Sequence, residues 1–471
     1  MQLDRFLGVT ILPEYIQTEG VDGVLDRLSQ AGVTAVATSP YLMEPADEAT
    51  GVREPPSDSG AGDVRLLDRP LWGKRELFVR TAPSFAPDPR LYRGLRYQPA
   101  AVTDLTRREG RILDEFIEGA HARHIKVYFQ IQAAIPPGYR VQFGGPEQAD
   151  RPRLPDGRIP LRRLANNGSL ASPQIRGYTE ALIRDLLRVY PDIDGIRVDW
   201  PEYPPYFLDD VFLDFGSHAR SAAERIGFDF ERMRRDALEL YRLLHGGLTR
   251  RHLAIWTERD GGRYGLLAAL TSKPGLLDLL RFKAALVDEL LAGFRKAITE
   301  AASARTELMP NAFPPPFTLA SGMDFARAGK HSAAISVKLY TMHWPMMLRF
   351  YGDVLRAANP GIADSLLTRA LVRWFDLADD DGLPGLADYK YPGPEEPHPV
   401  GAQAQARKIE EAQWEAGGTP VYALVHGYGP LSDFRGRLEV GYRASKRRIW
   451  INRYAYLSDE KLRIVAEVCR P

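Results

Sequence analysis

Two carboxylates in one short stretch, Asp199 and Glu202, have the residue types and spacing that acid/base chemistry needs. The residues Gly195–Asp199 alternate polar or small side chains with branched apolar ones, and this period of two is typical of a β-strand. A turn rich in proline and aromatic residues follows and carries Glu202. A carboxylate at a strand end with a second one three residues later is suited to acid/base work on a sugar bond. The alternative is a buried Arg197–Asp199 ion pair that holds the strand, with Glu202 facing water.

A resemblance to a known family rests on this same stretch. The letters DGIRVDWPEYP at residues 194–204 resemble the signature D-G-x-D-x-D-W-E-Y-P of chitinase-type (family 18) glycoside hydrolases and of related glycoside-hydrolase-like barrels. The stretch departs from that signature twice, because Arg197 stands at the middle aspartate and Pro201 is inserted before the glutamate. The Arg197-x-Asp199 pair is also similar to the fourth strand of α-amylase-type barrels, in which this aspartate is the nucleophile. The resemblance therefore implies a carbohydrate-active barrel and leaves the mechanism open.

The two families imply different roles for the two carboxylates. In the family 18 type the acetamido group of the substrate attacks, the glutamate is the acid and the preceding aspartate orients that group. This implies that Glu202 is the general acid/base and Asp199 the orienting carboxylate. If the inserted Pro201 moves Glu202 out of place, Asp199 becomes the nucleophile and another group must be the acid.

Strand and helix patterns alternate along the whole chain, which predicts an α/β protein with a parallel sheet. Eight such units predict a single (β/α)8 TIM barrel over residues 1–471. The expected strands are Phe6–Leu12, Val33–Thr38, Ile125–Ile131, Gly195–Asp199, Glu307–Ala312, Ala334–Tyr340, Val421–His426 and Arg448–Ala455. The expected helices include Val21–Ala31, Arg108–His121, Ser172–Tyr190 and a closing helix from Asp459.

The chain exceeds the roughly 250 residues that are typical of this barrel, so the excess must lie in loops. Residues 44–99 are rich in Pro, Gly and Asp but carry several aromatic residues, and we expect an ordered lid over the barrel mouth. Residues 133–171 carry six arginines, and residues 377–403 form a third loop insertion. The first two insertions follow strands, which places them on the catalytic, carboxyl-terminal face. Phe230–His245, capped by Asp229, and Leu276–Ala302 are expected to be helices that flank the barrel.

Reading each strand with its period of two places polar and aromatic side chains at the barrel mouth. Such a set suits sugars, because aromatic rings stack on sugar rings while amides and charges meet hydroxyl groups. Taken singly, the glutamines could be core residues bonded to the backbone, and the aromatics plain core residues. The predicted substrate-binding residues are Glu14, Gln130, Gln132, Arg197, Trp200, Tyr203, Asn311, Lys338, Tyr340, His343, Trp344, His426, Tyr428, Trp450, Asn452 and Tyr454.

Lys338 points inward from the sixth predicted strand, and a lysine there must pair with a carboxylate or shift its pKa. Asp199 or Glu202 could be the partner. A desolvated Lys338 could instead form a Schiff base with a carbonyl substrate, which predicts a lyase or aldolase. A third hypothesis is a non-catalytic carbohydrate-binding barrel that keeps the groove without the chemistry, since fold alone does not decide function.

Composition excludes several other classes. The formal net charge of +1 argues against partners such as nucleic acid or an acidic membrane surface. The single cysteine, Cys469, rules out a disulfide within the chain and a cysteine-rich zinc site. The first residues lack a charged leader with an apolar core, and no run approaches about 18 apolar residues, so we expect a cytoplasmic protein. The nine histidines show no metal-ligand spacing, so we expect no metal and no cofactor. The oligomeric state is left open.

Overall fold

The computed structural model describes residues 5–57, 65–257, 262–301 and 305–470. Three parts of the sequence predictions lie outside the described residues. These are the start of the chain at residues 1–4, residues 58–64 of the first insertion, and the last residue of the predicted helix Leu276–Ala302.

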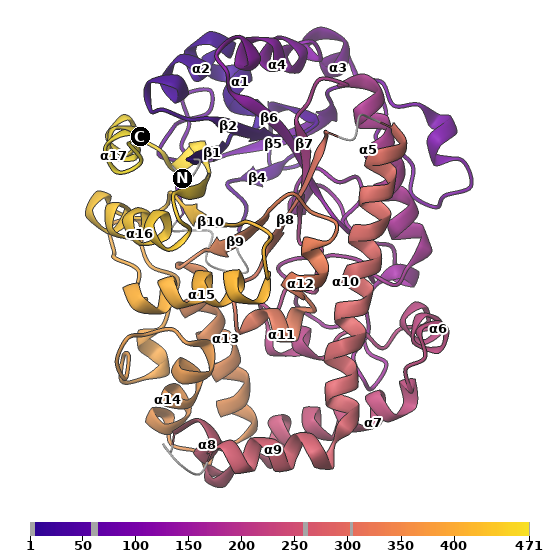
Figure 1. Cartoon of the computed structure of the whole chain (residues 1–471), viewed down its shortest axis with the longest axis vertical. Helices are drawn as coiled ribbons and strands as arrows, with labels where there is room; N and C mark the ends of the chain where they lie inside the picture. The colour runs from indigo at the N-terminus through magenta and orange to yellow at the C-terminus, as the bar shows by residue number, and fades with distance from the viewer. Residues whose placement is uncertain (1–4, 58–64, 258–261, 302–304, 471) are drawn as a thin grey trace.

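Eight parallel strands close into a barrel, which confirms the predicted (β/α)8 fold (Figure 1). Each strand is bonded to the next barrel strand along the chain, and the last strand is bonded to the first. All eight strands lie where the period of two predicts them, with ends that differ by a few residues. The barrel strands are β1 (Phe6–Thr10), β2 (Ala35–Thr38), β6 (Lys126–Gln132), β7 (Gly195–Asp199), β8 (Glu307–Ala312), β9 (Ile335–Leu339), β10 (Val421–His426) and β11 (Arg448–Asn452).

The register of these strands places the polar residues at their carboxyl-terminal ends side by side, at the same height along the barrel axis. Asp199 pairs with Gln132 of β6 on one side and with Asn311 of β8 on the other. On the far side of the barrel, His426 of β10 pairs with Asn452 of β11. Because parallel strands share one direction, these side chains meet at the carboxyl-terminal mouth of the barrel.

Helix α5 (Pro173–Val189) shows how the outer layer is built. The side chain of Ser172 caps its first turn by accepting a hydrogen bond from the Ile175 N–H at 3.3 Å. Ile175, Tyr178, Leu182 and Leu186 recur every three to four residues and are buried. Each such buried side chain contributes roughly 1.5–3 kcal/mol. The other helices around the barrel are α2 (Val21–Gln30), α4 (Ile112–Ala122), α10 (Pro274–Ala301), α13 (His343–Ala358), α15 (Ala402–Glu415), α16 (Leu431–Ala444) and α17 (Asp459–Val468).

A helical extension continues beyond the barrel along α10 and α13 (Figure 1). Asp229 caps α7 by accepting a hydrogen bond from the Arg232 N–H at 2.9 Å, as predicted. The expectation that this helix flanks the barrel is wrong, because α7 packs against the distal part of α10. The extension comprises α6 (Ser217–Ile226), α7 (Phe230–Arg242), α8 (Arg250–Thr257), α9 (Gly262–Ser272) and α14 (Asp364–Phe375).

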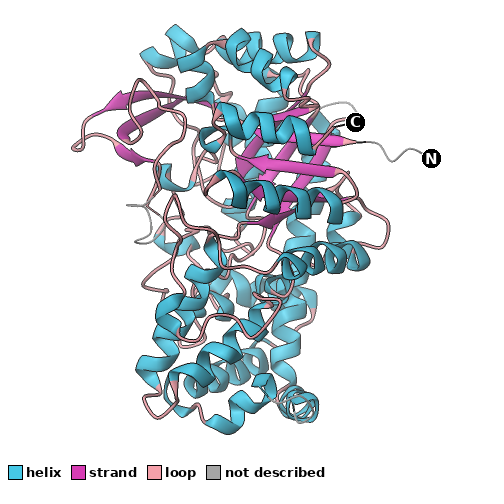
Figure 2. Ribbon diagram, turned by 90° about the vertical axis from the view of Figure 1, so that its left-hand side faces the viewer, coloured by secondary structure: helices cyan, strands magenta, loops and turns pink. Residues whose placement is uncertain are grey.

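The first insertion folds into a separate antiparallel sheet of three strands in the order β3-β5-β4. Figure 2 shows this sheet projecting to one side of the barrel strands. Between β4 and β5, Pro56 and Arg65 reach the wall of the barrel mouth. The strands are β3 (Tyr41–Ala46), β4 (Val52–Glu54) and β5 (Leu77–Pro83), and the remaining short helices are α1 (Pro13–Glu19), α3 (Asp104–Glu109), α11 (Phe317–Ser321) and α12 (Phe325–Gly329).

None of the helices in the described part of the chain combines the length and the apolar character that crossing a bilayer requires. The longest, α10, has 28 residues but carries several charged side chains.

Candidate active site

A cavity of about 120 Å³ lies at the carboxyl-terminal mouth of the barrel. It is small for a ligand site, since such cavities range upward from roughly 300 Å³. Its wall combines strand ends with residues of the first two insertions. The lining residues are Thr10, Leu12, Ser39, Pro56, Arg65, Gln130, Gln132, Tyr139, Arg140, Val141, Gln142, Leu164, Asp199, Trp200, Tyr206, Tyr340, His343, His426, Asn452 and Arg453.

Asp199 is the one carboxylate among the described residues that line this cavity. Its Oδ1 atom lies 2.6 Å from the Nζ atom of Lys338, and the Asp199 side chain is 13% exposed. The Trp200 N–H donates to the same oxygen at 3.2 Å. The ion pair and the backbone bond fix one side of the carboxylate, while the residue remains open to the cavity.

Asn311 links Asp199 to the interior of the barrel. Its Nδ2 atom donates to Asp199 Oδ1 at 3.4 Å and to Gln130 Oε1 at 3.2 Å. Its Oδ1 atom accepts a hydrogen bond from Arg197 Nη2 at 2.7 Å. Because a guanidinium group only donates, Arg197 requires the amide oxygen of Asn311 and thereby directs the amide nitrogen toward Asp199.

Arg197 is fully buried in the centre of the barrel. It donates to Ser336 Oγ and Thr10 Oγ1, both at 3.3 Å, and its guanidinium carbon lies 3.8 Å from the centroid of the Trp450 ring. Burial lowers the pKa of Arg197 to about 10, so the side chain is still charged at neutral pH. Asp199 pairs with Lys338, so the alternative of an Arg197–Asp199 ion pair is wrong. Neutral oxygens and the face of the Trp450 ring hold the Arg197 cation instead.

Glu202 is fully buried and does not line the cavity. Its Oε1 atom accepts a hydrogen bond from the Phe313 N–H at 2.7 Å, and its Oε2 atom accepts one from the Ser321 hydroxyl group. Burial raises the pKa of Glu202 to about 7, although Lys338, Ser321 and the Phe313 N–H favour the ionised form. The interpretation of Glu202 as a water-facing loop residue is wrong, because this glutamate fastens the loop after β7 to the segment after β8.

This buried carboxyl group makes stability depend on pH. The folded protein keeps the Glu202 proton up to about pH 7, whereas the ordinary pKa is 4.5, so the folded state binds more protons between these values. The stabilising contribution is complete below pH 4.5 and is lost as the pH rises through 7. We expect this group alone to lower the free energy of unfolding by about 3 kcal/mol across that window.

The Glu202→Gln variant, which has no such proton, should show a flatter profile in urea unfolding at pH 5 and pH 8. Replacing the exposed Glu115 with glutamine is the matched control and should leave the profile as in the wild type. A Glu202→Gln profile as steep as that of the wild type would contradict the prediction.

Lys338 is buried next to both carboxylates. Burial lowers its pKa, while the charges of Asp199 and Glu202 raise it. The Nζ atom also lies 5.1 Å from the Trp200 ring centroid and 5.3 Å from that of Phe313. The predicted pairing of Lys338 with a carboxylate of the motif is thus present, with Asp199 as the partner.

His426 and His343 both line the cavity, and their ring nitrogens have different hydrogen-bond partners. Burial, followed by the charge of Arg65, lowers the pKa of His426 well below its usual range, so the ring is neutral. Its Nδ1 atom accepts a hydrogen bond from the Tyr428 N–H at 3.1 Å, which places the ring proton on Nε2. His426 is therefore a hydrogen-bond donor. The Nδ1 atom of His343 lies 3.4 Å from the hydroxyl oxygen of Tyr206.

A buried cluster of two arginines and two glutamates supports the opposite wall. Arg140 contacts Glu14 at 3.0 Å and Glu54 at 2.9 Å, and Arg453 contacts Glu54 at 3.0 Å. Burial raises the pKa of Glu14. Burial acts on Glu54 in the same sense, but Arg140 and Arg453 outweigh it and lower the pKa of Glu54. Glu14 thus holds Arg140 from behind the wall, while Arg140 and Arg453 themselves line the cavity.

The structure brings fourteen of the eighteen sequence-predicted site residues to the cavity or to the layer directly behind it. Those that line the cavity are Gln130, Gln132, Asp199, Trp200, Tyr340, His343, His426 and Asn452. Five more have side chains that contact the lining or one another from behind, namely Glu14, Arg197, Asn311, Lys338 and Trp450. The sixth residue behind the lining is Glu202, whose charge interacts with that of Lys338.

The other four residues lie elsewhere because the strand period does not extend past the strand ends. The chain enters a 3₁₀ turn after Asn452, and the hydroxyl group of Tyr454 donates to Glu19 at 2.7 Å. Tyr428 lies beyond β10 and donates to the Pro392 carbonyl oxygen at 3.0 Å. The remaining two are Trp344, whose buried ring lies beside Lys408, and Tyr203, whose hydroxyl group contacts Asp214.

Sequence reasoning missed the arginines of the wall, Arg65, Arg140 and Arg453. The six arginines of residues 133–171 were a signal for Arg140, and Arg453 directly follows the predicted Asn452. The ring-bearing residues Tyr139 and Tyr206 were also missed, because both lie in loops where no period applies.

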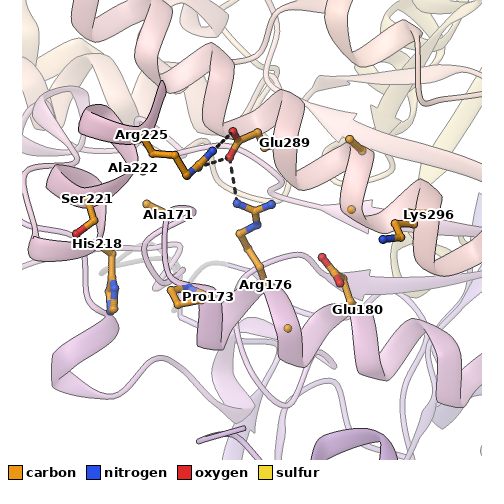
Figure 3. Close-up of a pocket in the computed structure, with 13 residues that line it drawn as sticks. Ala171, Pro173, Arg176, Glu180, His218, Ser221, Ala222, Arg225, Glu289 and Lys296 are labelled. Atoms are coloured by element: carbon orange, nitrogen blue, oxygen red, sulfur yellow. Dashed lines mark hydrogen bonds and ion pairs between the residues drawn. The ribbon is translucent and has the colours of Figure 1, made fainter. Parts of the chain in front are cut away.

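Neither the His, Cys, Asp and Glu side chains that the structure describes nor the larger groove on the outside of the barrel indicates a second functional site. Among the described residues, no group of three or more His, Cys, Asp or Glu side chains could hold a metal ion. A larger groove of about 950 Å³ lies outside the barrel, between α5, α6 and α10 (Figure 3). There Glu289 is held between Arg176 and Arg225, so its charges are already paired.

Comparison of the sequence with protein-family models and with curated proteins finds no match. The fold is similar to solved structures. One is a β-galactosidase from the psychrophilic Marinomonas ef1, with a TM-score of 0.51, 12% identity and coverage of 99% of this chain. This chain spans 59% of that protein. Two others are the catalytic domain of a β-amylase from Paenibacillus polymyxa and a Group IV chitinase from Ostrinia furnacalis. Their TM-scores are 0.44 and 0.42, each has 9% identity, and they cover 97% and 99% of this chain and 94% and 100% of their own lengths. The chain shares the (β/α)8 barrel fold with the β-galactosidase.

Proposed function

We propose that this protein is a glycoside hydrolase that acts on one sugar unit at the carboxyl-terminal mouth of its barrel. The observation that carries the proposal is Asp199, a carboxylate at the end of β7 that is oriented by Lys338 and Asn311 and lines the cavity. Gln130 and Gln132 supply amides on the strand next to Asp199, and Asn452 and His426 supply an amide and a hydrogen-bond donor from the far side of the mouth. Amides and donors around one carboxylate match the hydroxyl groups and the anomeric carbon of a sugar ring.

In this proposal the two carboxylates of the motif have unequal roles. Asp199 faces the anomeric carbon, either as the nucleophile or as the group that orients a substrate acetamide. Glu202, buried behind it, is a positioning residue that holds the loop after β7 through its hydrogen bond from the Phe313 N–H. The small cavity favours a single terminal sugar over an internal segment of a polysaccharide.

A panel of nitrophenyl glycosides of both anomeric configurations tests the proposal. Nitrophenolate leaves with little need for protonation, so these substrates report on Asp199 without an assigned acid. We expect at least one glycoside to release nitrophenolate with the wild-type protein and none with Asp199→Asn. Sugar binding without any turnover would support the non-catalytic barrel instead.

A second candidate is a Schiff-base lyase, which the buried Lys338 with its lowered pKa favours. Lys338 does not line the cavity, however, and its ammonium group is held by Asp199 at 2.6 Å. We therefore expect borohydride treatment with aldehyde and ketone sugars to leave the mass of the protein unchanged. A trapped adduct located at Lys338 would move the lyase ahead of the hydrolase. Absence of an adduct together with loss of glycoside turnover in Lys338→Met would assign Lys338 to the positioning of Asp199.

A further inference from the structure

The wall of the mouth cavity is rich in guanidinium groups. Among the described lining residues, Arg65, Arg140 and Arg453 carry positive charge and Asp199 alone carries negative charge. Two more carboxylates lie behind this wall, Glu14 and Glu54, as the partners of Arg140 and Arg453. Lys338 and Arg197 add two cations behind Asp199. Glu202 adds one more carboxyl group beside Lys338. Within the described part of the chain, five cations thus face four carboxyl groups around the cavity, and a wall with an excess of cations attracts an anion.

Arg453 is the group best placed to bind that anion. It stands directly after β11, is 9% exposed and lines the cavity. Its Nη2 atom contacts Glu54, whereas its Nε atom is buried and has no hydrogen-bond partner within the described part of the chain. A guanidinium group is a fork of donors, and the oxygens of a carboxylate or a sulfate match that fork better than a neutral hydroxyl group does.

The barrel topology separates this arginine from the proposed reacting carboxylate. In the closed order of strands, three strands (β8, β9 and β10) lie between β7, which ends in Asp199, and β11, which precedes Arg453. The two residues therefore stand on opposite walls of the mouth. A sugar with its anomeric carbon at Asp199 would direct the opposite end of its ring toward Arg453. That end consists of C4 and the neighbouring C5, which carries the C6 substituent of a hexose.

We propose that the substrate is an acidic glycoside, whose carboxylate or sulfate on the terminal sugar binds Arg453 with Arg65 and Arg140 beside it. This inference rests on the proposed function for the placement of the anomeric carbon. It goes further by naming the substrate class. An anionic substituent contributes a charge-assisted bond that the neutral sugar lacks, which corresponds to about 10- to 100-fold in affinity.

Binding of matched sugars to the wild-type protein is the first test, measured by isothermal titration calorimetry at low salt. The probes are D-glucuronate and D-galacturonate, the neutral sugars D-glucose and D-galactose, and their 6-sulfates. We expect at least one acidic sugar to bind about 10- to 100-fold more tightly than its neutral partner, with the difference reduced by added salt. The uronates and the sulfates then distinguish which anion the wall prefers.

Single substitutions test which side chain causes the tighter binding of acidic sugars. Arg453→Gln should remove most of it, and Arg453→Lys, which keeps the charge, should retain part of it. Arg176→Gln, in the outer groove, is the matched control and should retain all of it. A preference that survives intact in a folded Arg453→Gln protein would overturn the assignment of this residue. If that variant does not fold, the wild-type comparison of acidic and neutral sugars still decides the proposal.

The outcomes separate this inference from the proposed function. Neutral sugars that bind as tightly as acidic ones would overturn the inference and leave the hydrolase standing. Selective binding of an acidic sugar with no hydrolysis of the corresponding nitrophenyl glycosides would overturn the hydrolase and leave the anion site standing. Binding of none of the sugars would overturn the inference, while the nitrophenyl glycoside panel would still decide the proposed function.

Discussion

Replacing Asp199 with asparagine should lower glycoside turnover by on the order of 10³-fold or more and leave the barrel folded. Asparagine keeps the shape of the side chain but removes the negative charge that faces the cavity. The loss falls on kcat, because an uncharged amide can neither attack nor stabilise an anomeric carbon that becomes positively charged in the transition state. The effect is expected for both roles that the motif allows for Asp199.

The cost to stability should be modest. Asp199 is the ion-pair partner of Lys338, whose pKa burial already lowers, so Lys338 can give up its proton once the carboxylate is gone. We expect a loss of about 1–3 kcal/mol in the free energy of unfolding. Asp104→Asn, at an exposed ion pair on α3, serves as the matched control and should change neither turnover nor stability. Turnover near the wild-type level in Asp199→Asn would contradict the proposal, and an unfolded variant would indicate that the ion pair is structural.

A further variant separates the two roles of Asp199. Asp199→Gly opens space beside the anomeric carbon, and added azide can attack there in place of the carboxylate. If Asp199 is the nucleophile, azide should restore release of nitrophenolate and yield a glycosyl azide. If Asp199 orients a substrate acetamide, azide should have no effect, and only glycosides with a 2-acetamido group should be hydrolysed by the wild type.

The predicted strands match the structure because local pattern suffices for them. In β6, β7 and β9 the side chains that alternate with buried Ile, Val and Leu residues point into the barrel, so Gln130, Asp199 and Lys338 could be placed from the sequence. The pairing of Lys338 with the motif followed from charge, since a buried lysine needs a carboxylate. One strand period and one electrostatic rule thus account for the centre of the site.

The surroundings of the site depend on contacts that no local pattern contains. Glu202 is buried because Phe313 and Ser321, more than 100 positions later, supply its hydrogen bonds. Arg453 faces the cavity at the point where the strand period ends, and Arg140 is fixed by Glu54 from a separate sheet. The helix of residues 230–242 was predicted correctly, but its amphipathic face fits the side of α10 as well as it would fit a barrel. The positions of these side chains and of this helix therefore depend on residues that are distant in the sequence.

Arg197→Ala is expected to have the largest effect on stability, a loss of about 3–5 kcal/mol in the free energy of unfolding. The substitution removes a large, fully buried side chain and leaves a cavity against the face of Trp450. It also leaves the oxygens of Asn311, Ser336 and Thr10 without the guanidinium donor that each now contacts. Chemical unfolding at pH 7 measures the loss, and a value below about 1 kcal/mol would contradict the packing role.

Arg197→Met tests whether the charge of Arg197 serves the fold or the site. Methionine fills much of the same volume, and a desolvated cation is costly, so this variant should recover most of the stability that alanine loses. Turnover should not recover, because Asn311 then lacks the donor that fixes its amide oxygen and no longer presents its Nδ2 atom to Asp199. We expect kcat to fall by about 10-fold or more with little change in KM, because a misaligned catalytic group slows the chemical step more than it weakens substrate binding. Full activity in a stable Arg197→Met protein would show that Asp199 is held by Lys338 alone. Low activity in that stable protein would identify the buried arginine as a positioning residue that acts through Asn311.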